Sequence, residues 1–142
     1  MMYKFLAYHV VDYMHREPAF VAPGMTLKEL QALFEAKDFN ALPVVDGGRV
    51  VGFVTKLDFL KAFTFNTEHP VPNYDQVMRR TVADVMTRAI VTVEPEAPLT
   101  RVLQLMVELR ARSFPVVDAS GALAGIISRG DIMRALKDAT QA

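Results

Sequence analysis

The chain of 142 residues contains no cysteine. It therefore has no disulfide, no thiolate metal ligand and no cysteine nucleophile. It also has no surplus charge of either sign, because 16 Lys and Arg residues balance 16 Asp and Glu residues. A balanced chain lacks the positive field that attracts nucleic-acid backbones and anionic membrane surfaces. We therefore expect no nucleic-acid partner and no membrane partner.

Long apolar runs and recognisable catalytic motifs are also missing. No stretch reaches the roughly 20 apolar residues of a membrane helix, and Lys4 interrupts an N-terminus that has no small-residue cleavage site. We predict a cytoplasmic protein without an export signal. His9, His15 and His69 lack metal-ligand spacing, and no nucleophile stands with a base. We expect that the protein is not an enzyme, and that it has no metal site, no required cofactor and no catalytic residue.

What the sequence does have is an internal repeat. Residues 10–63 match residues 82–136, with one residue inserted in a turn of the second copy. The matched stretches include VVDYM with VADVM, PVVD with PVVD, and GFVTKLD with GIISRGD. A match over a whole supersecondary unit indicates duplication, because one such unit is too small to close a core alone. We predict two domains, residues 10–63 and 82–137, with a linker at 64–81.

Each copy shows the same order of patterns: a strand, a helix, two strands and a helix. The β-prone runs at 19–21 and 90–93 are each followed by a proline, which favours a short first strand. Apolar residues at helical spacing follow from Leu27 and from Leu99, and Thr26 with Glu29 forms a capping box. Glycine-containing turns predict a hairpin in each copy, to which we also assign Gly52. Final helices are expected at about 56–63 and 129–136. These patterns predict an α/β (α+β) fold.

The linker is punctuated by proline. His69-Pro70-Val71-Pro72 cannot form a regular helix, because each proline lacks the backbone donor and restrains its predecessor. Asn73 is predicted to cap a short helix that leads into the second copy. The segment from Lys4 to Tyr13 is predicted to play the same part for the first copy.

Polar residues with the same spacing lie at the last strand-to-helix junction of each copy. Thr55 with Asp58, and Ser128 with Asp131, have the spacing of a hydroxyl cap with an acidic third residue. Such a box needs no ligand to explain it. The same geometry also serves a ligand, because a helix N-terminus attracts phosphate and a carboxylate accepts hydrogen bonds from ribose hydroxyls. Duplication of the whole context favours the second interpretation.

With these motifs the sequence resembles the CBS domain family, named after cystathionine β-synthase. The resemblance rests on Pro-Val-Val-Asp followed by Gly-x-x-Thr/Ser-x-x-Asp in both copies. It implies two pseudo-symmetric β-α-β-β-α repeats that pack as one CBS-domain-pair module. It also implies an adenosine nucleotide, such as AMP, ADP, ATP or S-adenosylmethionine, in a cleft between the repeats, and a homodimer. The output would then reach a regulated protein in trans.

The resemblance also assigns roles to particular residues. Asp131 and Asp58 would hold the ribose, Ser128 and Thr55 would lie near ribose or phosphate, and Ile126, Ile90 and Val91 would border the adenine. Arg112 stands where related domains often have a basic residue facing phosphate, whereas the first copy has Asn40. Phe53, in place of Ile126, would either stack on a base or fill its space. Arg129 and Lys56 would assist with phosphate. We therefore rank the Ser128/Asp131 site first, with a ligand-free dimerisation or docking module as the alternative.

Overall fold

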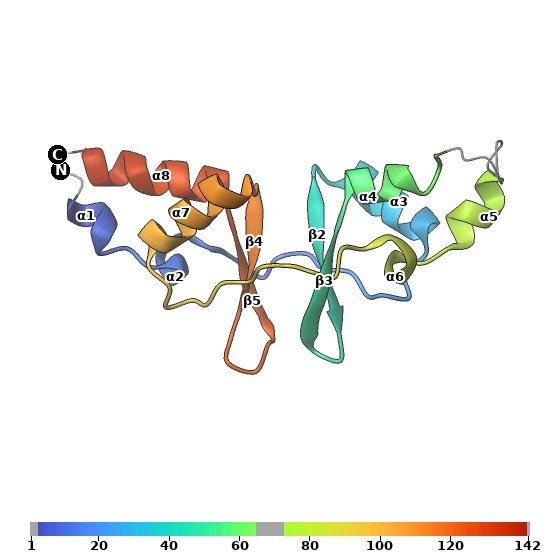
Figure 1. Cartoon of the computed structure of the whole chain (residues 1–142), viewed down its shortest axis with the longest axis horizontal. Helices are drawn as coiled ribbons and strands as arrows, with labels where there is room; N and C mark the ends of the chain where they lie inside the picture. The colour runs from blue at the N-terminus through green and yellow to red at the C-terminus, as the bar shows by residue number, and fades with distance from the viewer. Residues whose placement is uncertain (1–2, 65–72, 142) are drawn as a thin grey trace. The chain divides into compact units, whose positions relative to one another are not determined.

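The structure is a computed structural model that describes residues 3–64 and 73–141 (Figure 1). The prolines predicted to break the linker, and His69, lie outside the described residues. The chain forms two compact units. Unit 1 contains the N-terminal residues up to Pro18 and the chain from Val91 onward, and unit 2 runs from Ala19 to Ile90. Within the described ranges, no helix is both long and apolar enough to cross a bilayer.

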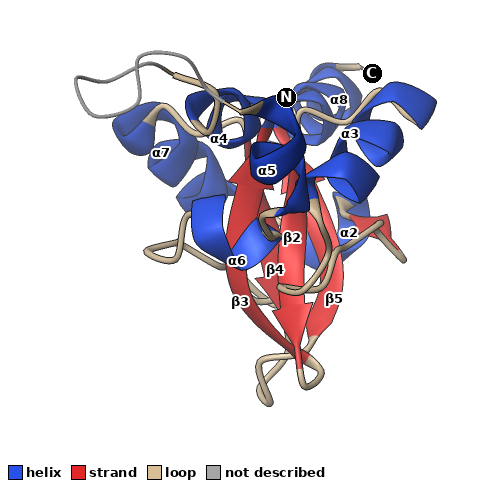
Figure 2. Ribbon diagram, turned by 90° about the vertical axis from the view of Figure 1, so that its right-hand side faces the viewer, coloured by secondary structure: helices blue, strands red, loops and turns tan. Residues whose placement is uncertain are grey.

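Unit 2 is a β-hairpin covered by helices. Strands β2 (Ala41–Asp46) and β3 (Arg49–Thr55) pair antiparallel. Gly47 and Gly48 have positive φ angles of 58° and 79° in the connecting turn, as the glycine-rich spacing predicts. Figure 2 shows that this turn lies at the end of the hairpin away from the helices. The helices are α3 (Leu27–Ala36), α4 (Lys56–Lys61), α5 (Tyr74–Arg79) and α6 (Val82–Val85).

Unit 1 has the same plan with one more strand and a longer final helix. Its sheet has the order β1-β5-β4 and is antiparallel throughout. The strands are β1 (His15–Arg16), β4 (Ser113–Val117) and β5 (Leu123–Ser128). The helices are α1 (Tyr3–Leu6), α2 (Val10–Tyr13), α7 (Leu99–Leu109) and α8 (Arg129–Thr140).

The opening segment of each repeat packs in the unit that holds the hairpin of the other repeat. In unit 1, α2 and β1 come from the start of the first repeat, and His15 pairs with Ile126 of β5. In unit 2, α6 comes from the start of the second repeat, and Thr87 bridges to Phe53 of β3. The compact units therefore do not coincide with the sequence repeats, and the domain boundaries read from the sequence mark repeats rather than units.

Local signals place the helices correctly. Thr26 accepts a hydrogen bond from the backbone of Glu29 at 3.2 Å, which is the predicted capping box of α3. Asn73 caps α5 through the backbone N–H of Gln76 at 3.1 Å. The predicted apolar stripes face the two cores. Leu27, Leu30 and Phe34 lie in the core of unit 2, and Leu99, Val102 and Met106 lie in that of unit 1.

The expected first strands need correction, and Gly52 has a further role. The predicted first strands at 19–21 and 90–93 are reduced to single parallel bridges, from Val21 to Val44 and from Val93 to Val116. A proline two residues after each bridging valine removes the next donor that a strand would need. Gly52 belongs to the hairpin, as expected, but the hairpin alone does not explain it. It lies inside β3, where an added Cβ would come within 2.7 Å of the Thr87 carbonyl oxygen.

Candidate functional site

Each unit carries one junction at which a strand passes directly into a helix. Thr55 ends β3 and caps α4, and Ser128 ends β5 and caps α8. Asp58 accepts a hydrogen bond from the Thr55 backbone N–H at 3.0 Å, and Asp131 accepts one from the Ser128 backbone N–H at 2.9 Å. The return bonds, from the aspartate N–H to the hydroxyl, measure 3.0 Å and 3.4 Å. Both boxes that the spacing predicts are therefore formed.

The two junction carboxylates have different partners. Oδ1 of Asp131 contacts Nη1 of Arg134 at 3.2 Å, and its Oδ2 also accepts from the Ser128 hydroxyl at 3.0 Å. Asp58 instead contacts the Thr87 hydroxyl, at 3.4 Å from each carboxylate oxygen. That separation is long for a hydroxyl hydrogen bond and therefore weak. Asp58 is only 8% exposed, so its poorly used oxygens are largely withdrawn from water.

The strand edge beside each junction differs in side-chain size. Ile126 in β5 is half-buried and pairs with His15, whereas Phe53 in β3 is buried and bridges to Thr87. Gly125 and Gly52 let these crossing segments come close. A Cβ added at Gly125 would lie 2.7 Å from the His15 carbonyl oxygen. A Cβ added at Gly52 would lie at the same distance from the Thr87 carbonyl oxygen. The absence of a side chain at these two glycines is therefore a condition for closing each junction.

Arg112 and Arg129, both predicted to face phosphate, differ in what their side chains contact. Arg112 lies beside its junction, because its carbonyl accepts a hydrogen bond from the Arg129 N–H at 3.0 Å, and its side chain is exposed. The Arg129 guanidinium, in contrast, donates to the carbonyls of Ala111 and Arg110 at 2.9 and 3.0 Å. These bonds satisfy carbonyls that directly follow the end of α7 at Leu109. Arg129 thus has a structural role in addition to any contact with phosphate.

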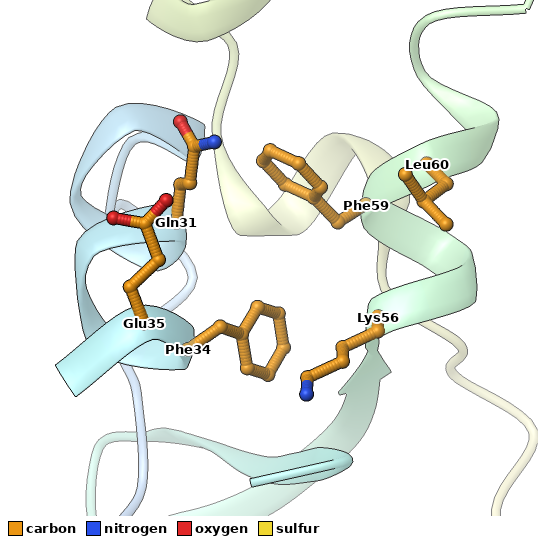
Figure 3. A pocket seen from close by; sticks show the side chains of 6 residues that line it. All are labelled: Gln31, Phe34, Glu35, Lys56, Phe59 and Leu60. Carbon is orange, nitrogen blue, oxygen red and sulfur yellow. The ribbon is translucent and has the colours of Figure 1, made fainter. Parts of the chain in front are cut away.

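Lys56 lines a groove between α3 and α4 in unit 2. Figure 3 shows its side chain and that of Phe34 pointing toward one another, with Phe59 and Leu60 on the same wall as Lys56. The equivalent groove of unit 1 lies between α7 and α8 and includes Arg129. Lys56 and Arg129, which directly follow the capping hydroxyls, therefore each line a groove between two helices of their unit.

Ile90 and Val91 lie where the two units meet in the sequence. Ile90 is half-buried at the end of unit 2, and Val91 is 41% exposed at the start of unit 1. Neither belongs to a strand, because Val93 forms the bridge to β4 instead. Their predicted role beside an adenine stays a prediction.

Three residues outside the set of predicted site residues surround the junctions. Thr87 and His15 follow the matched Met86 and Met14, so the repeat itself was the signal that could have found them. Arg134 lies three residues after Asp131, which is the spacing of a helical ion pair. Each is polar and directly adjoins a predicted site residue.

A hydrogen-bonded aromatic cluster supports the unit 1 junction. The Tyr13 hydroxyl donates to Asp138 at 2.6 Å, and its ring lies 5.0 Å from that of Tyr8. The Asp138 carboxylate, which accepts this hydrogen bond, raises the pKa of Tyr13 above its usual value. Arg134 donates to the Tyr13 carbonyl at 3.1 Å and lies over the same ring. The junction is thus tied to α2 and to the far part of α8.

The chemistry available at each junction is recognition of polar groups. Each holds a carboxylate that accepts hydrogen bonds, a hydroxyl, and an apolar residue two positions earlier on the same strand. Within residues 3–64 and 73–141, no cluster of three or more His, Asp or Glu side chains could hold a metal ion. The arrangement suits a neutral diol next to a flat apolar group, which is the chemistry of a nucleoside.

Comparison with known proteins places these junctions in a family. The model of the CBS domain matches residues 10–64 and 82–138. MJ1225 of Methanocaldococcus jannaschii is 29% identical over 127 residues. The match covers 87% of this chain but only 45% of MJ1225, so the chain spans less than half of that relative.

Two solved structures resemble the chain over nearly its full length. CBSX2 in complex with AMP has a TM-score of 0.79 and 27% identity, covering 94% of this chain and 99% of that one. The CBS domain pair of MJ0100, in complex with 5′-methylthioadenosine and S-adenosyl-L-methionine, has a TM-score of 0.74 and 26% identity. That match covers 92% of this chain and 97% of the other.

Proposed function

Because the chain belongs to the CBS domain family, we propose that it is a regulatory module that binds an adenosine-containing nucleotide at its strand-to-helix junctions. The main support for this proposal is that Asp58 and Asp131 each lie at the third position of a capped helix, beside an apolar strand residue. AMP, 5′-methylthioadenosine and S-adenosylmethionine, which the similar proteins bind, share an adenine and a ribose. A carboxylate and an apolar edge match those two shared parts.

Within this proposal, Asp131 and Asp58 accept hydrogen bonds from the ribose, and Ile126 and Phe53 lie along the base. Arg112 is the cation best placed for phosphate, because its side chain is exposed beside the junction of unit 1. Ser128 and Thr55 position the carboxylates through the capping boxes. The location of the ligand between the repeats, and the contributions of Ile90, Val91, Arg129 and Lys56, stay predictions.

Thermal unfolding in the presence of candidate ligands tests the proposal. A ligand that binds only the folded state raises the unfolding midpoint by mass action. We expect AMP, ADP, ATP or S-adenosylmethionine at millimolar concentration to raise the midpoint by several degrees. Asp131→Ala or Asp58→Ala should reduce that shift. Equal shifts in the wild type and in the Asp58→Ala/Asp131→Ala double variant would contradict the assignment of these sites.

Self-association is a second candidate function, supported by a separate observation. The groove between α7 and α8 has a volume of about 450 Å³, and Val107 and Met133 on its walls are each 70% exposed. Leu60, beside the equivalent groove of unit 2, is 59% exposed. Surfaces of this kind mark interaction sites. A second copy of this chain is the occupant that the family resemblance suggests.

Sedimentation velocity separates the two candidates. If the protein is a homodimer through this surface, Met133→Asp should dissociate it while leaving nucleotide binding in place. A module with only the docking function would dimerise without responding to any adenosine compound. In either case the signal would reach a partner protein through altered packing, and we infer a regulatory rather than an enzymatic role.

A further inference from the structure

Arg134 of α8 occupies the carboxylate that a ribose would need in unit 1. Its Nη1 lies 3.2 Å from Oδ1 of Asp131, whose side chain is only 13% exposed. The other oxygen of Asp131 already accepts from the Ser128 backbone N–H and from the Ser128 hydroxyl. A carboxylate has about four acceptor positions. Three of them are therefore used within the protein.

Arg134 is also held in place by groups other than Asp131. Its Nη2 donates to the Tyr13 carbonyl at 3.1 Å, and its guanidinium carbon lies 5.4 Å from the centre of the Tyr13 ring. The Tyr13 hydroxyl is fixed in turn by Asp138 at 2.6 Å. A guanidinium held on several sides does not leave its carboxylate without losing these contacts as well.

The equivalent site in unit 2 has no such arrangement. Lys61 stands three residues after Asp58, as Arg134 does after Asp131, but among the described residues it forms no ion pair with Asp58. Asp58 accepts one short hydrogen bond, from the Thr55 backbone N–H, and two long contacts from Thr87. Asp58 therefore holds no charged donor among these contacts, and its long contacts with Thr87 can give way to a diol more readily than the Arg134 ion pair can.

We propose that Arg134 competes with the ribose of a nucleotide for Asp131 and so weakens binding at the junction of unit 1 relative to that of unit 2. This inference rests on the proposed function and adds the residue that makes the two sites unequal. It reverses the ranking based on the sequence, which placed the Ser128/Asp131 site first. Binding at that site requires the guanidinium to give up Oδ1 of Asp131 to a ribose hydroxyl.

Adenosine is the appropriate probe, because it carries the diol without a phosphate that would itself attract Arg134. Its affinity is measured by titration calorimetry on the full chain in two backgrounds. The Asp58→Ala variant keeps only the unit 1 site intact, and the Asp131→Ala variant keeps only the unit 2 site intact. In the first background, Arg134→Met keeps a long apolar side chain but removes the competing donors. We expect it to strengthen adenosine binding about three- to fivefold, the scale of a partly exposed ion pair.

Lys61→Met in the Asp131→Ala background is the matched control and should leave the affinity nearly unchanged. With 2′-deoxyadenosine, which lacks one of the two hydroxyls, the gain from Arg134→Met should be smaller. Unchanged or weaker adenosine binding in Arg134→Met, with binding intact in its parent, would overturn the inference alone. No adenosine binding in the wild type or in any variant would overturn the proposed function and this inference with it.

Nuclear magnetic resonance of the wild-type protein provides a readout that does not depend on Asp58→Ala folding. The Nε–Hε signal of Arg134, assigned by its loss in Arg134→Met, should shift as adenosine is added. That of Arg129, whose guanidinium is bonded to the Arg110 and Ala111 carbonyls rather than to Asp131, should move less. A titration in which adenosine binds but the Arg134 signal stays fixed would contradict competition.

Discussion

The final helices of the two units differ in length and in what they pack against. Helix α8 has 12 residues, buries Ile132, Ala135 and Ala139, and contacts α1, α2 and α7. Helix α4 has six residues, and only Asp58 within it is buried. Although the junction sequence is duplicated, the surroundings are not. The capping box is thus a local property that both copies retain, while the use of the carboxylate depends on the helix that follows.

The N-terminal segment shows the same contrast. In unit 1, Phe5 is buried and its ring meets that of Tyr8, so α1 closes the core beside α7 and α8. In unit 2, α5 packs on α3 and has no buried residue. In unit 1 the aromatic contacts are tied to Asp138 and Arg134, whereas the described aromatic contacts of unit 2 join Phe59, Phe63 and Tyr74 to one another. The comparison teaches that equal repeats support unequal sites when their outer layers diverge.

The largest expected effect comes from removing one core side chain in each unit. Leu27 and Leu99 are both 0% exposed at the first position of α3 and α7. We expect Leu27→Ala and Leu99→Ala each to lower the free energy of unfolding by about 3 kcal/mol, through lost burial and the cavity that remains. Urea denaturation measures both. A much smaller loss for Leu27→Ala would show that unit 2 contributes less to cooperative stability.

The two crossing glycines form a closer comparison. A Cβ added at Gly125 would lie 2.9 Å from Sδ of Met14, whereas a Cβ added at Gly52 would lie 3.2 Å from Sδ of Met86. Both would also meet a backbone oxygen at 2.7 Å. We therefore expect losses of about 1–3 kcal/mol, with Gly125→Ala the more damaging.

Gly24→Ala is the control for these substitutions, because nothing lies within 4 Å of its added Cβ. It should leave the free energy of unfolding within about 0.5 kcal/mol of the wild type. Tolerance of alanine at Gly52 or Gly125 would mean that the crossing segments move apart freely.

Removing the capping hydroxyls should have a smaller effect. Thr55→Ala and Ser128→Ala should each cost about 1 kcal/mol in chemical denaturation. The loss should be larger for Ser128, because its hydroxyl also donates to Oδ2 of Asp131 at 3.0 Å, in addition to accepting from the Asp131 N–H at 3.4 Å. Ser128→Thr keeps the hydroxyl and should restore stability. Equal losses in both copies would argue that this additional hydrogen bond does not matter.

The smallest effect concerns the Tyr13 hydroxyl, which the matching Val85 of unit 2 lacks. Tyr13→Phe should lower stability by about 0.5 kcal/mol at neutral pH, the low end for one hydrogen bond, because this bond is exposed to solvent. Since Asp138 raises the pKa of Tyr13 in the folded protein, the wild-type advantage should persist below pH about 10. It should be lost as the pH rises further. Stability curves that stay parallel up to pH 11 would contradict this role.

Much of the fold was predictable because its signals are local. Helical spacing placed α3 and α7, Thr26 and Asn73 marked helix starts, and glycines located the β2–β3 turn. The repeat revealed both junctions, and the family resemblance is confirmed. The first strands were overpredicted, because a β-prone run does not show that the following proline limits pairing to one residue.

Thus the sequence by itself determined the duplication, the family, the two capped junctions and their pairs of hydroxyl and carboxylate. These follow from periodicity and from spacings of three or four residues. Only the tertiary structure decided that β1 joins β5, that Gly52 and Gly125 admit crossing carbonyls, and that Tyr13 of α2 holds Arg134 beside the second carboxylate. Such contacts join segments far apart in the chain, and pairing at long range leaves no period or spacing in the sequence from which it can be read.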